Sequence, residues 1–530
     1  MTYFYCKSQI DNKHQKFCRV WFYCKKEVVI NNSVELESNI MFNTLLVANR
    51  GEIAVRIIRA ARELGIKTYA VYSPVDKQAL HAKLADEAIG LVEYGDVSSY
   101  LDIDQILAIC LREKIQCVHP GYGFLSESEI FAKKLVENNI HYVGPPPEVI
   151  ELLGNKVKSR NIAKRVGLTI PPGSLVIRNE TQALREARRI GYPVLVKAVF
   201  GGGGMGIQIA ENPKKLKTAI INASAQAESA FGRGEVFIEK FIDQPRHIEF
   251  QILADNFGNV VHLGERECSI QRRNQKLLEE APSTIITADD REKIGKLVCK
   301  LAKRVGYRNA GTVEFLFKDG QIMFNEVNPR IQVEHPVTEM LTGKDIVKEQ
   351  LRIARGEKLS FSQSDINFRG HAIELRINAE DPLQNFQPTP GQVKKLVAPG
   401  GPQVRFDTAI YESFTVPNCY DSLIGKMIVA DETREEAIHR AKTALKELTI
   451  LGFATNIPFF EELLNDEKFI KGEITIKFIE DRKILENIKK RMCLQASALY
   501  AVGKKKNELS LPTKSDQWRM RGKMEAIGRD

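Results

Sequence analysis

A run of glycines between two short apolar segments constrains this chain more than any other feature. Five of the six residues from 201 to 206 are glycine, within the stretch LVKAVFGGGGMGIQIA. Ordering glycine costs conformational entropy, so such a run fits a backbone that must bend freely or approach another molecule closely. Residues 194–198 before it and 207–210 after it have the composition of strands. The pattern predicts a hairpin with a glycine-rich tip.

Two well-known phosphate-binding loops do not fit this segment. Gly201, Gly203 and Gly206 satisfy G-x-G-x-x-G, but the dinucleotide-binding loop needs a helix at its last glycine, and a strand follows here. A Walker A loop needs Lys and then Ser or Thr, where this chain has Ile207 and Gln208. A hairpin tip with unhindered backbone N–H groups can instead close over a polyphosphate as a lid. The alternative is a flexible surface turn.

Lys197 favours the polyphosphate interpretation of the glycine hairpin. It interrupts the apolar segment VLVKA. Because an unpaired ammonium group is costly to bury, an anionic partner is expected, and phosphate is a candidate.

A second hairpin is predicted around residues 318–321, where Lys-Asp-Gly-Gln separates two β-rich segments. If its loop has three residues, Glu314 lies opposite Glu326, and Asn328 shares the face of Glu326. Two carboxylates about 4 Å apart repel by roughly 4 kcal/mol at an effective dielectric constant of about 20. Mg²⁺ or Mn²⁺ would remove this repulsion. The alternative is two solvated carboxylates on an exposed strand.

Polar residues continue at every second position after this hairpin. They are Glu326, Asn328, Arg330, Gln332 and Glu334. Since Pro329 does not suit a central strand, we expect an extended edge of a site. Arg330 can clamp an anion and Glu334 can act as a base, as a bicarbonate reaction requires, although a surface salt bridge is the ordinary alternative. Residues 268–283, which include Lys276, form either a second anion-binding wall or a solvated loop.

The segments before the glycine hairpin alternate between strand and helix patterns. A strand at 44–48, an amphipathic helix at 52–64 and a strand at 67–72 open a parallel α/β domain that reaches residue 143. Ser126 and Glu129 form an expected capping box for a later helix.

Proline and glycine mark the later boundaries. The prolines of residues 144–149 indicate a linker. A third region begins near residue 368 with a strand in HAIELRINAE, and a helix is expected at 434–448. The final segment from about 486 is basic and polar, which predicts a helix followed by a partly disordered tail.

Composition excludes several classes of protein. The net charge is +10, but 77 basic residues are interspersed with 67 acidic ones, so we expect anionic small substrates and no nucleic acid. Nine cysteines without close pairs indicate free thiols in a reducing compartment. No apolar run is long enough to cross a bilayer, which predicts a cytoplasmic protein with no membrane contact. Residues 1–41 show no pattern and are treated as an extension.

A series of motifs, in this order along residues 42–485, resembles the biotin carboxylases. The motifs are VANRGEIAVRI, HPGYGFLSE, LVKAVFGGGGMG, FIEKF, PRHIE, ERECSIQRRNQK, GTVEFLF, NEVNPRIQVEHPVTE, ELRINAEDP and CYDSLIGK. The resemblance implies an α/β and α+β chain in three parts. They are a Rossmann-like N-terminal domain at 42–152, an ATP-grasp domain at 153–366 with its lid at about 170–241, and a mixed α+β C-terminal domain at 367–485, followed by a basic tail at 486–530.

The same resemblance implies a reaction and its partners. An enzyme of this family uses ATP with two Mg²⁺ or Mn²⁺ ions to activate bicarbonate as carboxyphosphate, and then carboxylates biotin. The biotin is attached to a biotin carboxyl carrier protein, because this chain has no Met-Lys-Met site of its own. The resemblance also implies a homodimer and a carboxyltransferase subunit. The expected final acceptor is an acyl-CoA, and pyruvate is the alternative.

The resemblance assigns roles to individual residues. Lys156 and Lys197 match the lysines on the ATP phosphate and adenine side, Gly203 and Gly204 the lid, and His247 a ribose contact. The segment that reads adenine is matched by Glu239, Lys240 and Ile242. The metal site is matched by Glu314, Glu326 and Asn328. Bicarbonate binding is matched by Lys276, Arg330, Gln332, Val333 and Glu334, with Glu334 as the base, and Arg376 matches the residue that holds biotin.

The chain departs from the family pattern at three positions. Asn274, expected near the nucleotide, replaces a common His and cannot titrate, and Met205 replaces a basic residue in the lid. Pro402 replaces an aromatic residue of some dimer contacts. Two other functions remain open: another ATP-grasp ligase, such as carbamoyl phosphate synthetase or a carboxylating ligase of purine synthesis, and a nucleotide-sensing regulatory protein. The first should lack RIQVEHPVTE with ELRINAED, and the second should have lost Glu326, Arg330 or Glu334.

Overall fold

A computed structural model describes residues 42–92, 99–201, 206–491, 493, 494 and 497. The expected extension at 1–41, the tip of the glycine hairpin at 202–205 and the tail from 498 lie outside the described residues. Among those described, no helix is long and apolar enough to cross a membrane.

The N-terminal region is a parallel five-stranded sheet with the strand order β3-β2-β1-β4-β5. Its strands are β1 (Thr44–Val47), β2 (Lys67–Tyr72), β3 (Glu87–Gly90), β4 (Cys117–His119) and β5 (His141–Tyr142). The helices are α1 (Gly51–Glu63), α2 (Leu80–Leu84), α3 (Ile103–Arg112) and α4 (Glu129–Glu137). Gly65 follows α1 with φ of 68°, as its position after the helix requires. The predicted parallel α/β domain is confirmed.

Two local predictions in this region are wrong. The N-cap of α4 is Ser128, whose hydroxyl accepts from the backbone N–H of Phe131, so Ser126 and Glu129 do not form a capping box. The expected linker is partly helical, because α5 (Pro147–Gly154) begins on a proline, which suits a first helical turn.

The glycine hairpin belongs to a small four-stranded sheet with the order β6-β9-β7-β8. Its strands are β6 (Gly173–Val176), β7 (Val194–Ala198), β8 (Ile207–Ala210) and β9 (Val236–Lys240), and the nearby helices are α6 (Lys156–Val166), α7 (Glu180–Ile190) and α8 (Pro213–Phe231). β7 and β8 pair antiparallel, with Lys197 opposite Ile207. The two predicted strands and their antiparallel pairing are therefore confirmed, while the tip between them lies outside the described residues.

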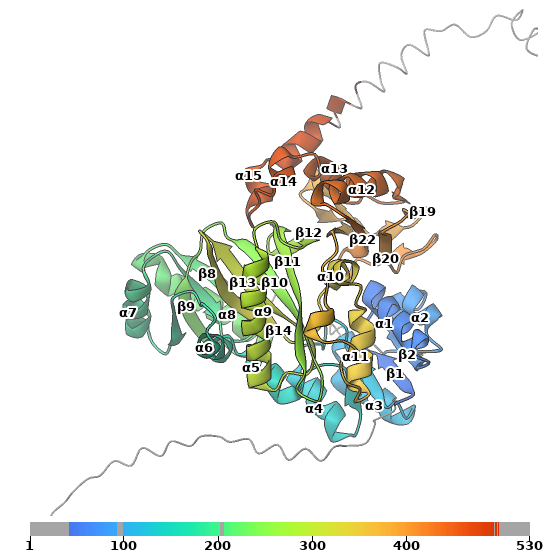
Figure 1. The fold of residues 1–530 in the computed structure, drawn as a ribbon, viewed down its shortest axis with the longest axis horizontal. Coiled ribbons are helices and arrows are strands. Elements are labelled where there is room, and N and C mark those ends of the chain that lie inside the picture. Colours follow the sequence, from blue (N-terminus) through green and yellow to red (C-terminus); the bar gives the residue numbers. More distant parts are fainter. Residues whose placement is uncertain (1–41, 93–98, 202–205, 492, 495–496, 498–530) are drawn as a thin grey trace, which may run out of the picture. The chain divides into compact units, whose positions relative to one another are not determined.

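The largest sheet has eight strands in the order β14-β13-β10-β11-β12-β15-β22-β20, and all of its pairings are antiparallel. Its strands are β10 (Arg246–Ala254), β11 (Val260–Arg272), β12 (Gln275–Ala281), β13 (Asn309–Lys318), β14 (Gln321–Asn328), β15 (His371–Asn378), β20 (Val404–Thr408) and β22 (Leu423–Asp431). Figure 1 shows α9 (Ala288–Val305) lying across this sheet. The strand predicted in HAIELRINAE is β15, and it continues the sheet of the preceding region rather than starting a separate one.

Helices and short strands complete the C-terminal half. The helices are α10 (His335–Thr342), α11 (Ile346–Ala354), α12 (Arg434–Glu447), α13 (Ile457–Leu463), α14 (Glu467–Ile470) and α15 (Phe478–Asp481). The short strands pair as β16 (Glu380–Asp381) with β17 (Gln387–Pro388), β18 (Gly391–Gln392) with β21 (Thr415–Val416), and β19 (Lys395–Val397) with β23 (Thr449–Leu451). The helix predicted at 434–448 is confirmed as α12, and residues 484–491 of the final segment are helical.

Candidate active site

Glu314 on β13 lies directly opposite Glu326 on β14, as the sequence predicts. The reason differs from the one expected. The connecting turn has two central residues, Asp319 and Gly320, both with positive φ, rather than three. A bulge at Asn325 then shifts the register by one residue, so that the two carboxylates still face each other.

Glu314 is buried and surrounded by donors. Its Oε1 accepts from Asn328 Nδ2 at 2.7 Å and from Gln332 Nε2 at 3.1 Å, while its Oε2 lies 3.0 Å from His247 Nε2. Burial alone would raise the pKa of Glu314, but Lys276 and His247 outweigh burial and hold the pKa well below its usual range. This carboxylate is therefore an anion near neutral pH.

Glu326 has a lysine as its partner. Its Oε2 lies 3.0 Å from Lys156 Nζ, at the start of α6. Burial would lower the pKa of Lys156, but the negative charge of Glu326 outweighs it and the pKa is raised. The loop that leads into α6 thus brings a cation to the predicted metal site.

The predicted metal ligands fit a hard cation. Glu314, Glu326 and Asn328 offer only oxygen atoms of the type that Mg²⁺ and Mn²⁺ prefer. Asn328 already contacts Glu314 directly, and Glu314 lies opposite Glu326 across the two strands. A cation here would take over charge compensation from Lys156 and His247.

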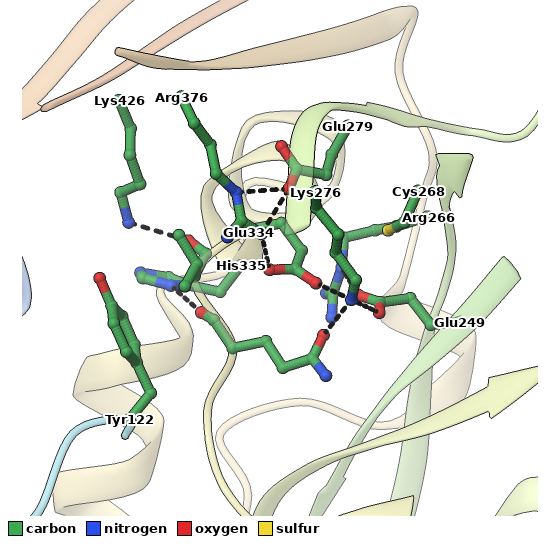
Figure 2. A network of polar contacts seen from close by, with 12 residues as sticks. Tyr122, Glu249, Arg266, Cys268, Lys276, Glu279, Glu334, His335, Arg376 and Lys426 are labelled. Carbon is green, nitrogen blue, oxygen red and sulfur yellow. Dashed lines mark hydrogen bonds and ion pairs between the residues drawn. The ribbon is translucent and has the colours of Figure 1, made fainter. Parts of the chain in front are cut away.

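Glu334 lies between two cations at the centre of the site. Its Oε1 accepts from Lys276 Nζ, and its Oε2 lies 2.7 Å from an Nη of Arg376, as Figure 2 shows. Lys276 also donates to Glu249 at 2.7 Å, and Arg376 Nε donates to Glu279 at 2.6 Å. Burial would raise the pKa of Glu334, but Lys276 and Arg376 hold it well below its usual range. An ionised carboxylate is thereby fixed where two strands and a loop meet.

The segment after β14 is not the extended edge that its polar alternation predicts. β14 ends at Asn328, since Pro329 cannot donate to a neighbouring strand, and bends and a turn then lead to α10 at His335. Arg330 Nε donates to Glu127 at 2.6 Å rather than to Glu334. The backbone carbonyl of Val333 accepts from Lys426 Nζ at 2.8 Å. Gln332 and Glu334 are buried, and the loop after β14 brings them into contact with Glu314 and Lys276, respectively.

The four-stranded sheet β6-β9-β7-β8, which we call the lid sheet, contributes Lys197 on β7 and Glu239 on β9. Lys197 Nζ lies 3.1 Å from Glu239 Oε2 and donates to Asn325 Oδ1 at 3.1 Å, so the anionic partner in this structure is a carboxylate. Arg160 of α6 is a second partner of Glu239. Lys240 Nζ, at the end of β9 in the same sheet, donates to the carbonyl of Gly191 at 2.9 Å.

The remaining predicted residues lie outside these contacts. Asn274 is an exposed central residue of the turn between β11 and β12, with φ of 65°, and the structure does not bring it to the cluster. Ile242 is half-buried just after β9. Gly203 and Gly204 lie outside the described residues.

Sequence reasoning missed several charges of this network. Four of them are buried, namely Glu249, Arg266, Glu279 and Lys426, whereas Glu127 is exposed. Lys426 interrupts the apolar segment LIGKMIVA as Lys197 interrupts VLVKA, so the same signal could have found it. Arg266 is fully buried against Glu249. It does not interrupt an apolar segment, because its sequence neighbours Glu265 and Glu267 are also charged, so the same signal could not have found it.

The small sheet that carries the glycine hairpin and the antiparallel sheet with paired carboxylates make up an ATP-grasp fold, which is the fold of a class of ATP-dependent ligases. Family models agree with this class. Residues 41–150 match the model described as biotin carboxylase, N-terminal domain, and residues 374–481 match the biotin carboxylase C-terminal domain. Residues 155–362 match the model of the carbamoyl-phosphate synthase L chain, ATP binding domain.

Two curated proteins and one solved structure match this chain over 90% or more of their own length. A biotin carboxylase of Nostoc sp. is 49% identical over 83% of this chain and 99% of the relative. A pyruvate carboxylase subunit of Methanothermobacter thermautotrophicus is 49% identical over 83% of this chain and 90% of the relative. The biotin carboxylase domain dimer of Hydrogenobacter thermophilus 2-oxoglutarate carboxylase, solved with MgADP, ADP and bicarbonate, has a TM-score of 0.82 and 47% identity, and covers 84% of this chain and 98% of that chain.

The chain belongs to the biotin carboxylase family and is an ATP-dependent ligase. The predicted family, fold class and enzymatic activity are confirmed. The alternative of a regulatory protein lacking the site is not supported, since Glu326, Arg330 and Glu334 are all present.

Proposed function

We propose that this chain uses MgATP and bicarbonate to carboxylate biotin carried by a partner protein. The observation that carries the proposal is Glu334, a buried carboxylate held ionised between Lys276 and Arg376. A base, an anion-binding lysine and an arginine for a developing oxyanion are the groups that this chemistry needs.

The nucleotide and metal would bind between the lid sheet and the carboxylate hairpin. Glu314, Glu326 and Asn328 would hold Mg²⁺, which neutralises phosphate charge when bound. Lys156 and Lys197 would turn from Glu326 and Glu239 toward the phosphates, and Gly203 and Gly204 would cover them. Glu239, Lys240 and Ile242 would contact adenine. His247 would contact ribose from its place beside Glu314.

Bicarbonate would bind where Lys276, Arg330, Gln332 and the backbone of Val333 converge on Glu334. An anion there would compete with Glu334 for Lys276 and Arg376. Because these cations hold the pKa of Glu334 low, sharing them raises that pKa and makes Glu334 a better proton acceptor. Arg376 would then stabilise the negative charge that develops on the ureido oxygen of biotin.

The proposed partners rest on the family to which the chain belongs. We propose a biotin carboxyl carrier protein as substrate, a separate carboxyltransferase, a homodimer and a cytoplasmic location. The described cysteines, which are Cys110, Cys117, Cys268, Cys299, Cys419 and Cys493, are all free, which supports a reducing compartment. An acyl-CoA is the proposed final acceptor, and pyruvate is the alternative that the pyruvate carboxylase relative supports.

The test is ATP hydrolysis by the purified full-length chain. We expect hydrolysis to depend on bicarbonate and to rise on addition of free biotin, with carboxybiotin as product. Glu334→Gln should lose both stimulations and still bind MgATP. Hydrolysis that is indifferent to biotin would contradict the proposal. Assaying the complex isolated with its native carboxyltransferase against acetyl-CoA, propionyl-CoA, pyruvate and 2-oxoglutarate would identify the acceptor.

A further inference from the structure

Two buried glutamates face each other next to Arg376, the arginine that we propose to contact biotin. Glu279 on β12 and Glu374 on β15 are directly opposed residues of an antiparallel pair. Both side chains are fully buried. Opposed residues have Cβ atoms about 5 Å apart, so two ionised carboxylates here would repel strongly in a dry interior.

The hydrogen bonds of the two glutamates differ. Glu279 Oε1 accepts from Arg376 Nε at 2.6 Å, whereas neither carboxyl oxygen of Glu374 has a partner among the described residues. A buried carboxylate without a donor is costly, and protonation removes most of that cost. The contacts therefore favour an ionised Glu279 and a neutral Glu374.

Charge pairing in the surrounding cluster leads to the same assignment. Three other carboxylates nearby each contact a cation: Glu249 with Arg266, Glu334 with Lys276, and Glu52 with Lys426. Lys276 is shared with Glu249. Arg376 is shared by Glu279 and Glu334. Lys426, opposite Arg376 on β22, already contacts Glu52 and the carbonyl of Val333. No described cation within bonding distance is left for Glu374.

The titratable groups around the pair come from every element packed against it. They are Lys276 on β12, Arg376 on β15, Lys426 on β22, Glu334 and His335 at the start of α10, Glu52 on α1, and Tyr122 after β4. Burial raises the pKa of Glu374 well above its usual range; Lys426 opposes this and Glu279 adds to it. Burial also raises the pKa of Glu279 to about 7, although Arg376 opposes it. Glu279 therefore ionises first.

We propose that Glu279 and Glu374 form a buried acid pair in which Glu374 holds the proton and Glu279 is a positioning residue for Arg376. The proposal rests on the proposed function, in which Arg376 contacts biotin. Glu334 loses its charge when it accepts the bicarbonate proton, and it then holds Arg376 less firmly. Glu279 keeps the guanidinium in place through that step. The neutral Glu374 does not compete for Arg376.

An infrared measurement tests the protonation state without reference to activity. The full-length protein at about pH 9, where Glu279 with its pKa of about 7 is ionised, should show the carbonyl-stretch band of a protonated carboxylic acid that is absent from Glu374→Gln. The band should remain in Glu280→Gln, which changes the neighbouring buried glutamate on the opposite face of β12. A spectrum that Glu374→Gln leaves unchanged would overturn the proposal, whether or not the protein carboxylates biotin.

Kinetics test the positioning role. The measured quantity is the ratio of biotin-dependent to biotin-independent ATP hydrolysis. We expect Glu374→Gln to keep this ratio within about twofold, since an amide mimics the neutral acid. Glu279→Gln should lower the ratio at least about tenfold, because a charge-assisted bond to Arg376 is lost. Glu280→Gln should leave it unchanged. Equal damage from Glu374→Gln and Glu279→Gln would overturn the pair assignment.

The pH profile separates positioning from a merely structural role. In wild type and Glu374→Gln, biotin-dependent turnover should fall as pH decreases through about 7, where Glu279 becomes protonated. Glu279→Gln should lack this acidic limb. A limb that persists in Glu279→Gln would overturn the role of Glu279. If the wild-type protein shows no biotin-dependent turnover, the proposed function fails, while the infrared band still decides the acid pair.

Discussion

Arg330 and Glu127 form an ion pair of 2.6 Å that joins the loop after β14 to the loop after β4. They are separated by 203 residues in the sequence. Burial would lower the pKa of Arg330, but the charge of Glu127 outweighs it and the pKa is raised. The N-terminal parallel domain thus fixes a side chain that we propose to bind bicarbonate.

Glu127→Gln should weaken bicarbonate binding. The Glu127 side chain is 42% exposed, so the pair is worth about 1 kcal/mol and its loss should raise the KM for bicarbonate about fivefold. Steady-state ATP hydrolysis at varied bicarbonate measures this. Asp104→Asn, which breaks an exposed pair with Lys134, is the control. A change confined to the KM for ATP would contradict the prediction.

Arg376→Ala should nearly abolish carboxylation of biotin. Its guanidinium holds two buried carboxylates, so alanine also leaves Glu279 and Glu334 short of a cation. We expect a loss of at least about a hundredfold in turnover with free biotin, which is typical for removal of a charge-stabilising donor. MgATP binding, measured by calorimetry, should persist. Near-normal turnover would rule out this role.

Lys197→Met should weaken nucleotide binding. Methionine replaces the buried stem and removes the charge, while Arg160 remains as a partner of Glu239 and keeps the lid sheet folded. A charged hydrogen bond to phosphate is worth about 1.5–3 kcal/mol, so the Kd for MgATP should rise at least about tenfold. Lys215→Met, at an exposed pair with Glu211, should leave the Kd unchanged. Equal effects of the two variants would count against a phosphate role.

Glu280→Gln should reduce stability in a pH-dependent way. Glu280 is fully buried and contacts His371 at 2.7 Å and Arg434 at 2.6 Å. Burial opposes ionisation, but these two partners lower the pKa of Glu280 from 4.5 to about 2. A depressed folded pKa stabilises the protein above the unfolded value, and this stabilisation is lost as pH falls from 4.5 to about 2.

The corresponding measurement is thermal unfolding at several pH values. The shift corresponds to on the order of 3 kcal/mol at neutral pH. Glu280→Gln should lower the unfolding temperature near neutral pH, and the gap to wild type should narrow as pH falls below about 4. Glu461→Gln, at a partly exposed pair with Arg491, is the control and should show a small, constant difference. A gap that widens in acid would refute the assignment.

Local patterns predicted the elements that carry most of this site. The strand after Gly206 identified a hairpin rather than a helix-capped loop, and β8 is present. The opposition of Glu314 and Glu326 was predicted from an incorrect loop length, because sequence does not reveal a bulge at Asn325. The prediction of an extended edge after Asn328 was also wrong. Polar residues at every second position indicate a strand only where the backbone stays extended, and β14 ends at Asn328.

The sequence by itself determined the family, the glycine hairpin, the carboxylate hairpin and the types of residue that the chemistry needs. These follow from short-range patterns, in which neighbours in sequence are neighbours in space. Only the tertiary structure decided that Arg330 meets Glu127 and that Glu334 lies between Lys276 and Arg376. It also decided that Glu374 faces Glu279 with no donor among the described residues. Those pairings depend on strand order and loop paths between distant segments, and the ionisation of each carboxylate depends on the burial and charges that result.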